Sequence, residues 1–260
     1  MIKKQYGSQQ HWQFNSFNEI QSIRHLITGR NLDISTKGIY DGLNYGLNVL
    51  DHIHVVEANR TELLQHLNIP KGTLNIPIQT HSNNIVVVTN TNKHQVFENT
   101  DALITNTPNI AIGALSADCV PILMVDPIGN VVASIHAGWR GTAAQIAANT
   151  VFKMMEQFNS LPENILVGIG PSISAAYYEV GEEVAAYFST ESKTLQANGK
   201  SCVDLWIENE RQLLNIGLLK KNISISGMCT FSNTDLFYSA RKESIQTGRM
   251  ASVISLIESV

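Results

Sequence analysis

The chain has 260 residues, of which 43% are hydrophobic and 15% charged, and its formal net charge at pH 7 is -4. This ordinary balance indicates a globular protein, and the length favours one large domain over residues 1–260. The acidic net charge argues against nucleic acid as a partner. No window holds the roughly 18 unbroken apolar residues that span a membrane, so we expect no membrane association.

The N-terminal segment MIKKQYGSQQHWQF has two lysines but lacks the apolar stretch of a secretory signal. The cysteines are odd in number and lie far apart, at Cys119, Cys202 and Cys229. Because no export signal directs the chain to an oxidising compartment, we expect free thiols and a cytoplasmic location.

Short apolar runs separated by Asn, Gly, Pro and Asp predict many strands. In the first part of the chain we expect strands at 12–14, 24–28, 74–80 and 84–89. A Gly- and Asn-rich loop over 29–54 has the length of a functional or mobile loop. Helical spacing predicts a helix over 55–67 that ends before Asn68 and Pro70. Turn-forming residues over 80–84 predict a hairpin between the last two of these strands.

The segment 116–146 predicts a strand, a Pro-Ile-Gly-Asn turn, a second strand and the start of a helix. This Ala-rich helix extends from Thr142 to Phe158. Thr142 is its N-cap if residues 138–142 form a tight strand-to-helix turn. The remaining predictions are strands at 101–105, 111–117, 164–169, 223–227, 235–239 and 251–257, and helices at 181–189 and 205–217. Strands outnumber helices and occur both as hairpins and as strand–helix units, which favours an α+β fold with mixed sheets.

Two of the eight histidines, His81 and His136, lie where predicted strands end among small residues. With Cys119 they form a Cys-His-His set, spaced by 38 residues (81 to 119) and 17 residues (119 to 136). These spacings are far from the compact motifs of structural zinc fingers. Three ligands from separate strand ends suit a catalytic zinc, which keeps a fourth position open for water or substrate. Thiolate with imidazoles also suits copper.

Two other interpretations of Cys119 stay open. A lone cysteine on an apolar strand is commonly a small buried hydrophobe. Alternatively, Asp118-Cys119 with His136 or His81 provides a thiol nucleophile and its base, which require only a thiolate and an imidazole within hydrogen-bond reach.

Three arginines are candidate anion-binding residues. Arg140 lies between two glycines at the mouth of a predicted helix, and helix N-termini bind anions; the alternative is a tight strand-to-helix turn. Arg60 in the middle of the first long helix and Arg241 near the C-terminus are the others, and Arg249, which follows Gly248, is considered together with Arg241. An ordinary surface position is the alternative for each. Phosphate chemistry in so acidic a chain would require two or three of them.

Several sequence blocks occur in a specific order, namely QTHSNNIVVV, DALITN, SADCVPILMVDP, IHAGWRGT, GIGPSI, YYEVG, FYSARKE and TGRMASV. In this order and at these distances they resemble the YfiH-like laccase-domain family, also called multicopper polyphenol oxidoreductase or peptidoglycan editing factor proteins. The resemblance runs from about residue 24 to the C-terminus, and the SADCVP and HAGWRGT blocks are its most specific part.

This resemblance implies an α+β fold of mixed sheets sandwiched between helices, similar to the catalytic domain of the cytotoxic necrotizing factor toxins. It implies one metal, commonly zinc, held by His81, Cys119 and His136. The activities implied are phosphorolysis of adenosine, inosine or methylthioadenosine to base and sugar 1-phosphate, and hydrolytic deamination of adenosine. Peptidoglycan-precursor editing and polyphenol oxidation have also been attributed to the family.

Deamination requires a carboxylate that shuttles protons. Asp118 is nearest in sequence to the metal set, and Glu179, which follows an aromatic pair, is the second candidate. In phosphorolysis, phosphate attacks the ribose anomeric carbon and would be held by Arg60, Arg140 or Arg241. The expected partners are therefore small molecules, a purine nucleoside and phosphate. A Cys-His hydrolase or amidase of cell-wall precursors is the alternative enzyme, and a metal-binding partner protein is the non-enzymatic alternative.

The chain departs from the family pattern outside the metal set. The early Thr-Thr-Arg-x-Gly-Gly-Val-Ser segment is ITGRNLDIS, Gln-Val-His-Gly is QTHS, a glycine is Ser174, and Ser-His/Tyr-Arg-Arg is SARK. These changes bear on substrate preference, because they surround the metal set rather than alter it.

The histidine count bears on the laccase name. A laccase-type multicopper oxidase uses about ten histidines, largely in His-x-His pairs. This chain has eight histidines in all and one such pair, His52-Ile53-His54. It cannot assemble a multicopper cluster within one subunit, so we rank laccase chemistry below the nucleoside reactions.

Overall fold

The computed structural model describes residues 1–34, 37–69 and 71–258. In these residues, two six-stranded sheets form the centre of the molecule. The first sheet contains, in spatial order, β1 (Ile2–Tyr6), β2 (Gln9–Gln13), β3 (Ile23–Thr28), β15 (Met250–Leu256), β7 (Ile110–Ser116) and β4 (Thr73–Asn75). The second contains β14 (Ile223–Ile225), β10 (Leu166–Ile169), β8 (Val120–Asp126), β9 (Val131–Ala137), β6 (Ala102–Thr105) and β5 (Ile85–Val87).

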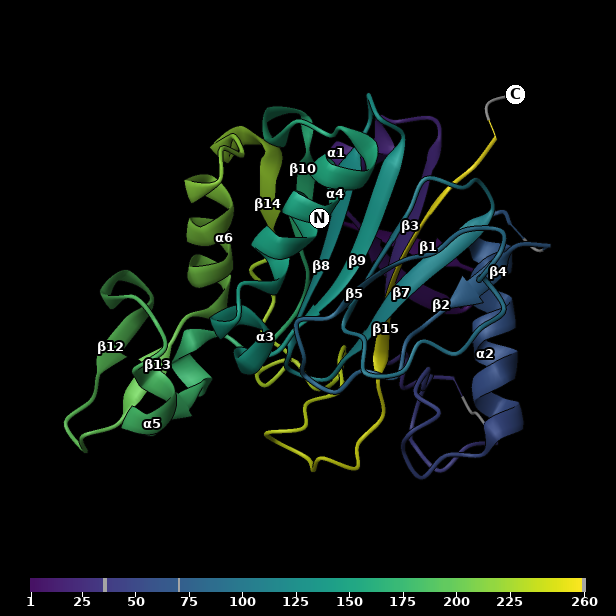
Figure 1. Cartoon of the computed structure of the whole chain (residues 1–260). Helices are drawn as coiled ribbons and strands as arrows, with labels where there is room; N and C mark the ends of the chain where they lie inside the picture. Colours follow the sequence, from purple (N-terminus) through teal and green to yellow (C-terminus); the bar gives the residue numbers. More distant parts are fainter. Residues whose placement is uncertain (35–36, 70, 259–260) are drawn as a thin grey trace.

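Both large sheets are mixed. The pairs β4/β7, β5/β6 and β10/β14 are parallel, whereas the other pairs in these sheets are antiparallel. A smaller antiparallel sheet projects to one side of the molecule (Figure 1) and consists of β11 (Glu179–Val180), β13 (Ser201–Val203) and β12 (Lys193–Leu195).

Six α-helices occur in the described residues, and three of them have only four or five residues. They are α1 (Asn15–Asn18), α2 (Ile53–His66), α3 (Trp139–Ala143), α4 (Ile146–Phe158), α5 (Glu182–Ala185) and α6 (Leu205–Asn215), with single 3-10 turns at Pro162–Asn164, Ala175–Tyr177, Thr190–Ser192 and Lys220–Asn222. In the described ranges, none of the helices is long and apolar enough to cross a bilayer.

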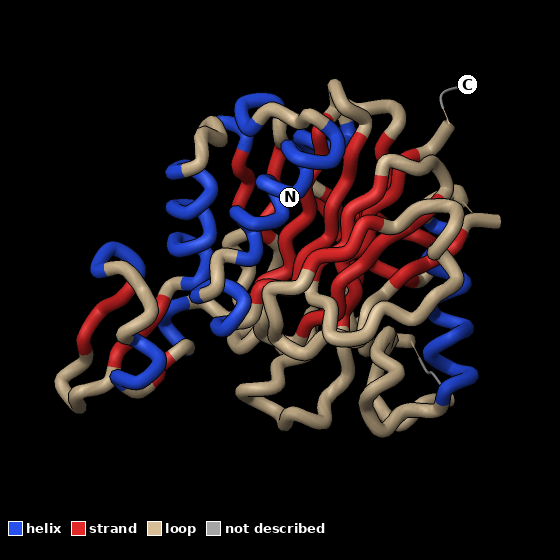
Figure 2. Tube along the Cα trace, viewed as in Figure 1, coloured by secondary structure: helices blue, strands red, loops and turns tan. Residues whose placement is uncertain are grey.

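Strands β6, β8 and β9 of the second sheet have every residue buried, and because successive side chains of a strand point to opposite faces, these strands are buried on both faces. Ile122 faces the helices and packs in one cluster with Val151 and Met154 of α4. Leu123, the next residue, faces the first sheet and packs with Ile112 of β7. The two sheets therefore pack face to face, and α4 and α6 cover the outer face of the second (Figures 1 and 2).

Helix α2 covers the outer face of the first sheet. Its Leu63 packs, together with Leu67 just beyond its end, against Leu26, Ala111 and Val253 of the sheet. The order of layers is thus helix, sheet, sheet, helix. This confirms the predicted α+β fold with mixed sheets between helices.

The β8–β9 hairpin confirms the prediction for the segment 116–146. Its antiparallel register sets Pro121 opposite His136 and Val120 opposite Ala137. Cys119 precedes β8 directly, so the hairpin brings the thiol beside the imidazole. The proximity of Cys119 and His136 follows from local sequence, because a four-residue turn joins the two apolar strands that carry them.

The predicted hairpin between 74–80 and 84–89 is wrong. Strand β4 pairs with β7 in the first sheet, whereas β5 pairs with β6 in the second. The chain crosses from one sheet to the other over 76–84, and the buried carboxylate of Asp101 accepts the N–H groups of Thr80, His81 and Ser82 at the crossing. The backbone N–H groups of this segment therefore bond to a carboxylate distant in sequence and not to a neighbouring strand, as they would in a hairpin.

The single predicted helix from Thr142 to Phe158 is two helices, α3 and α4. Gln145 between them has a left-handed backbone with φ +58, which interrupts the helical path. Thr142 is not an N-cap, because Gly138 occupies that position of α3. The Thr142 hydroxyl is instead buried and accepts a hydrogen bond from Nδ2 of Asn209 on α6 (3.1 Å).

The predicted strand at 235–239 is also wrong. Phe237 and Tyr238 are both fully buried, but Phe237 N–H donates to the carbonyl of Asn233 in a turn. Strand β1 and the small sheet have no counterpart among the predictions. The predicted loop 29–54 is confirmed up to the start of α2 for its described residues; residues 35 and 36 of that loop, and Pro70 beyond the helix, lie outside the described residues.

The packing of the two sheets predicts a contrast between two leucines. Leu103 of β6 is fully buried between the sheets, whereas Leu195 of β12 is 71% exposed. We expect Leu103→Ala to lower the free energy of unfolding by about 3 kcal/mol, because it opens a cavity in the core. Leu195→Ala should change it by less than about 0.5 kcal/mol. Urea unfolding measures both, and equal midpoints would contradict the packing.

Candidate metal centre

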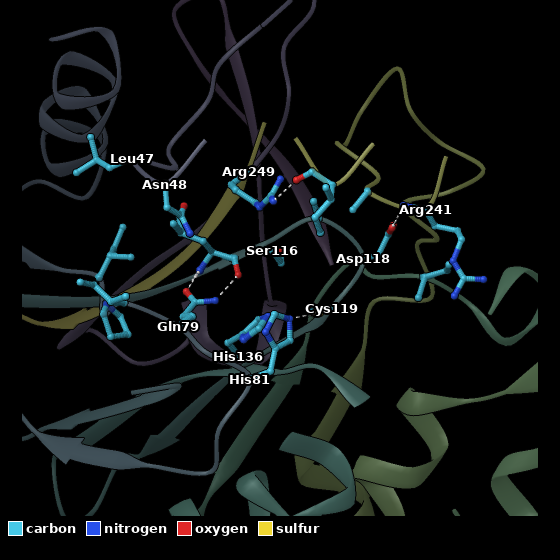
Figure 3. Close-up of a pocket in the computed structure, with 18 of the residues that line it drawn as sticks. Leu47, Asn48, Gln79, His81, Ser116, Asp118, Cys119, His136, Arg241 and Arg249 are labelled. Atoms are coloured by element: carbon cyan, nitrogen blue, oxygen red, sulfur yellow. Dashed lines mark hydrogen bonds between the residues drawn. The ribbon is translucent and has the colours of Figure 1, made fainter. Parts of the chain in front are cut away.

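His81, Cys119 and His136 lie together at one end of a cavity (Figure 3). One potential ligand atom from each falls within 4.8 Å of the others. The Cys119 Sγ is 3.8 Å from Nε2 of His81, and the two imidazole rings meet edge to face with centroids 4.9 Å apart. Among the described residues, these three form the one group of at least three His, Cys, Asp or Glu side chains that could hold a metal ion.

The three donors differ in exposure. His136, inside β9, is 4% exposed. Cys119 is half-buried and His81 is exposed. The set is therefore fixed by a sheet on one side and open to the cavity on the other, which leaves room for a further ligand.

Asp101 holds two of the donors in place. Within the described part of the chain its carboxylate accepts five hydrogen bonds. Its Oδ1 accepts the N–H of His81 (3.0 Å) and Nδ1–H of His136 (2.8 Å). Its Oδ2 accepts the N–H groups of Thr80 and Ser82 and the Ser82 hydroxyl. Because Nδ1 of His136 donates to Asp101, its Nε2 is the nitrogen available for a metal.

The Asp101 carboxylate is ionised over the whole neutral range. Burial raises the pKa of this carboxyl, but the hydrogen bonds from His136 and Ser82 outweigh burial and lower the pKa to about 2. His81 has φ +60, a left-handed backbone that costs energy in a residue other than glycine. The three N–H groups donated to Asp101 stabilise this turn and aim the His81 ring at Cys119.

Cys119 and His136 shift each other's protonation. Burial raises the pKa of the Cys119 thiol, but the charge of His136 and hydrogen bonds from His136 and His81 outweigh it and lower the pKa to about 6. Burial lowers the pKa of His136, but Cys119 and Asp101 outweigh it and raise the pKa to about 9. Cys119 is therefore a thiolate at neutral pH, the form that binds metals and attacks electrophiles.

The lack of a side chain at Gly138 makes room for His81 and Cys119. A Cβ at this position would lie 2.8 Å from Cδ2 of His81 and 3.1 Å from Sγ of Cys119. Its backbone has φ -68, so any residue could adopt the conformation. The glycine is therefore required here for space and not for backbone freedom.

Asp118 lines the cavity, and its side chain and carbonyl accept hydrogen bonds from three segments around it. Its Oδ1 accepts the Thr230 hydroxyl (2.6 Å), and its Oδ2 accepts the backbone N–H of Arg241 (2.7 Å). Its carbonyl accepts the N–H of Ile173 (3.0 Å). Asp118 has φ +95, a strained backbone for a residue with a side chain. These contacts join three distant segments directly beside Cys119.

The cavity above the three donors has a volume of about 420 Å³. Its walls are largely apolar, and its polar lining includes Asn48, Gln79, Ser116 and the arginines Arg60, Arg241 and Arg249. Asp118 is the carboxylate among the lining residues. A concave apolar space with a few convergent polar groups is the usual form of a small-molecule site.

Two of the three predicted arginines reach this cavity. Arg60 donates from Nε and Nη2 to the carbonyl of Tyr45 (2.9 and 2.7 Å). Arg241 donates to the carbonyl of Glu179 (3.1 Å) and lies over the Tyr178 ring. Arg140 is exposed, stacks on its neighbour in the chain and does not line the cavity.

The Glu179 carboxylate does not line the cavity. It accepts hydrogen bonds from Nδ2 of Asn198 and Nζ of Lys200, both at 3.0 Å. These contacts belong to the small side sheet. Of the two predicted carboxylates, Asp118 is the one brought beside the metal set.

The sequence analysis missed Asp101 as a site residue, and it considered Gly138 only for an anion at the helix mouth. Asp101 carried a usable signal, because it directly precedes the largely apolar run Ala102–Ile104, and an acidic residue buried beside such a run must have hydrogen-bond partners. Arg249 lines the cavity while its guanidinium donates to the carbonyls of Thr247, Gly248 and Ile245. Only the folded chain brings it near the donors.

Fold and site together define an α+β protein with a candidate three-donor metal centre at the ends of paired strands. Residues 24–257 match the model of a family described as multi-copper polyphenol oxidoreductase laccase. The chain therefore belongs to this family, whose members include proteins named YfiH and YlmD.

The chain is similar along most of its length to curated relatives. It is 33% identical over 257 residues to a protein of Bacteroides thetaiotaomicron named purine nucleoside phosphorylase, covering 94% of this chain and 95% of the relative. It is 34% identical over 236 residues to adenosine deaminase RL5 of an unknown prokaryotic organism, covering 83% and 89%. The crystal structure of a hypothetical protein YfiH from Bacillus licheniformis matches with a TM-score of 0.89 at 28% identity, covering 98% of both chains.

The space at Gly138 predicts a specific loss. We expect Gly138→Ala to weaken zinc binding roughly 10- to 100-fold, because the new methyl group displaces His81 and Cys119. Gly141→Ala is the matched control, since a Cβ there meets no atom closer than 3.3 Å. Zinc titration against a competing chelator measures both variants. Equal affinities would show that the donors do not bind metal in this arrangement.

The lowered pKa of Cys119 predicts its reactivity. In protein stripped of metal, alkylation of Cys119 by iodoacetamide should rise with pH with a midpoint at about 6 instead of 9. The reason is that the reactive thiolate is already formed beside His136. His136→Ala should move the midpoint upward, since it removes the charge and the hydrogen bond. Mass spectrometry of the Cys119 peptide separates it from the other cysteines, and an ordinary midpoint near 9 would contradict the pairing.

Proposed function

We propose that the protein is a cytoplasmic, zinc-dependent purine nucleoside enzyme. It would phosphorolyse adenosine, inosine or methylthioadenosine to base and sugar 1-phosphate, and deaminate adenosine. The observation that carries the proposal is the convergence of His81, Cys119 and His136 on one cavity that arginines also line. The relatives named purine nucleoside phosphorylase and adenosine deaminase support it.

The donor set fits a zinc ion. One thiolate and two imidazoles within 4.8 Å of one another provide three ligands, and the exposed side of His81 leaves a fourth position. Zinc bound there supplies Lewis-acid activation of water or of a substrate oxygen. The thiolate at Cys119 is already in the form that binds metal, and the bond from Nδ1 of His136 to Asp101 orients the ring. Because the pKa of His136 is raised to about 9, its Nε2 must release a proton when a metal binds.

Asp118 is the carboxylate that we propose for proton transfer in deamination. It lines the cavity beside Cys119, whereas the Glu179 side chain is held in the side sheet. The Thr230 hydroxyl donates to Asp118, which gives the carboxylate a neighbour through which a proton can pass.

Arg60 and Arg241 are the residues that we propose for the phosphate in phosphorolysis. A phosphate oxygen forms the new bond to the ribose anomeric carbon while the bond from that carbon to the purine nitrogen breaks. The electron pair leaves with the purine, which takes up a proton. The two guanidinium groups would hold the phosphate dianion in a cavity whose walls are otherwise largely apolar.

A metal-free Cys-His hydrolase of cell-wall precursors is the second candidate. The thiolate of Cys119 beside His136 favours it, because this pair is also the starting state of a thiol nucleophile. The fold expected from the resemblance, similar to the catalytic domain of the cytotoxic necrotizing factors, also suggests this alternative. Copper polyphenol oxidation has weaker support, because the chain has eight histidines and one donor cluster in its described residues.

The direct test supplies purified protein with adenosine and phosphate and separates the products by chromatography. We expect adenine and ribose 1-phosphate from phosphorolysis, and inosine from deamination. Cys119→Ala should lower both rates at least about 100-fold and remove bound zinc, because it deletes a ligand. Cys202→Ala is the matched control, since Cys202 lies in β13 of the side sheet.

The outcomes separate the two candidates. Zinc present in stoichiometric amount and lost with Cys119→Ala supports the nucleoside enzyme. Activity on cell-wall precursors that resists chelators but is lost on alkylation supports the hydrolase. If wild-type protein forms neither adenine nor inosine, the proposed function is wrong.

A further inference from the structure

Two uncharged polar side chains of the cavity have no partner in the described part of the protein. Ser116, the last residue of β7, is only 2% exposed, and Asn48 is an exposed residue of the loop before α2. Both line the cavity above the metal donors (Figure 3). Within the described residues, neither the Ser116 hydroxyl nor the Asn48 amide makes a hydrogen bond. Both groups are therefore available to a ligand.

The position of the Ser116 hydroxyl follows from the alternation of side chains along β7. Ile112 and Ser116 lie on the same face of this strand, and Ile112 packs between the two sheets. Ser116 thus lies where the layer between the sheets ends, three residues before Cys119. The hydroxyl of Ser252 on the neighbouring β15 is enclosed without a partner, whereas that of Ser116 is not enclosed and opens into the cavity.

A hydroxyl on so buried a residue is costly when it has no acceptor or donor beside it. Buried polar groups of folded proteins nearly always have a partner, and those in a binding site obtain it from the ligand. The Ser116 hydroxyl therefore indicates a ligand with a polar group at this point of the cavity.

Asn48 lies on a loop whose backbone is fixed beside the cavity. The Tyr45 carbonyl accepts Nε and Nη2 of Arg60, and the Tyr45 N–H donates to the carbonyl of Arg249 (3.0 Å). The Asn44 side chain accepts the N–H of Arg249 (2.9 Å). These bonds hold the loop in place, while the Asn48 amide can turn either its oxygen or its nitrogen toward a ligand.

The Gln79 amide, which lines the same part of the cavity, is already occupied. Its Nε2 donates to the Leu115 carbonyl (2.9 Å), and its Oε1 accepts the Leu115 N–H (2.7 Å). These two bonds fix the end of β7 directly before Ser116. Gln79 is thus a support for the strand end, and Ser116 and Asn48 are left to contact the ligand.

A hydroxyl and a carboxamide suit a ligand that carries hydroxyl groups. Each of them both donates and accepts hydrogen bonds, as an alcohol does, and neither has a charge that would favour an ion. Adenosine, inosine and methylthioadenosine differ at position 6 of the purine and at the 5′ carbon. Their shared polar part is the pair of hydroxyls at the 2′ and 3′ carbons of the ribose. A subsite that serves all three must recognise this shared part.

We infer that Ser116 and Asn48 bind the 2′,3′-diol of the ribose. This inference rests on the proposed function and extends it, because it assigns one part of the substrate to one side of the cavity. Asp118 lies on the other side of the cavity from Asn48 (Figure 3). With the ribose beside Asn48, the purine extends toward the metal donors and Asp118, where deamination takes place. The site therefore selects ribonucleosides over deoxyribonucleosides.

The test removes one hydrogen-bonding group at a time from the protein and from the ligand. The variants are Ser116→Ala and Asn48→Ala, and the ligands are adenosine, 2′-deoxyadenosine and 3′-deoxyadenosine. In calorimetric titrations of wild type, we expect each deoxy compound to bind roughly tenfold more weakly than adenosine, the effect of one hydrogen bond. In the variant that lacks the partner of the missing hydroxyl, this difference should fall below about twofold, because the bond is already absent.

Two control variants remove the same groups elsewhere. Ser252→Ala deletes the enclosed hydroxyl on the strand next to Ser116, and Asn106→Ala deletes an exposed amide after β6. Neither residue lines the cavity. Both variants should keep the wild-type preference for adenosine over the two deoxy compounds.

Purine riboside, which lacks the 6-amino group, separates the ribose from the base. If Ser116→Ala or Asn48→Ala abolishes the difference between adenosine and purine riboside and leaves the deoxy differences intact, these side chains contact the base and the inference is wrong. Wild-type discrimination against both deoxy compounds in both variants also overturns it.

Turnover by wild type distinguishes this inference from the proposed function. If wild type forms adenine or inosine while both variants keep the wild-type preference, the proposed function stands and the inference fails. If wild type forms neither product but binds adenosine with the expected dependence on both hydroxyls and both side chains, the proposed reactions fail and the ribose subsite stands. If wild type does not bind adenosine, both are wrong.

Discussion

The bond network around the Asp101 carboxylate is the interaction on which the site depends. One oxygen binds the backbone of His81 and the ring of His136, and the other binds the residues that flank His81. The carboxylate thereby closes the crossing between the two sheets and orients two donors together. A single ionised group can do this because its two oxygens offer about four acceptor sites, and burial makes each unmade bond costly.

Both acidic residues beside the donors hold backbone segments in place. Asp101 accepts hydrogen bonds from the crossing segment that contains His81. Asp118, whose own backbone is strained, precedes Cys119 and accepts hydrogen bonds from the Thr230 hydroxyl and from the backbone N–H of Arg241. Negative charge near the donors is thus already paired with hydrogen bonds. The cavity is lined by a thiolate, two histidine rings and arginines whose guanidinium groups donate to neutral carbonyls, a combination suited to a metal and an anionic substrate.

Local patterns predicted the part of the site that local structure builds. The turn between two apolar runs brought Cys119 beside His136, and the hairpin β8–β9 confirms it. His81, the predicted third residue, lies in the candidate metal group, but the hairpin assigned to it was wrong. The reason is that its turn is formed by Asp101, twenty residues away, and not by a strand partner. Arg140, predicted from its place at a helix mouth, does not line the cavity; it is exposed and stacks on Trp139.

The sequence by itself determined the α+β class and most strands, and it predicted the three candidate donors that the fold brings together, because alternation, turn residues and the family blocks are properties of short segments. Only the tertiary structure decided which charged residues join the donors. Asp101, Arg60 and Arg249 come from an unrelated strand end, a helix and the C-terminal region, and face-to-face packing of two sheets brings them together. No short-range pattern encodes that meeting, because it depends on which strands become neighbours across the whole chain.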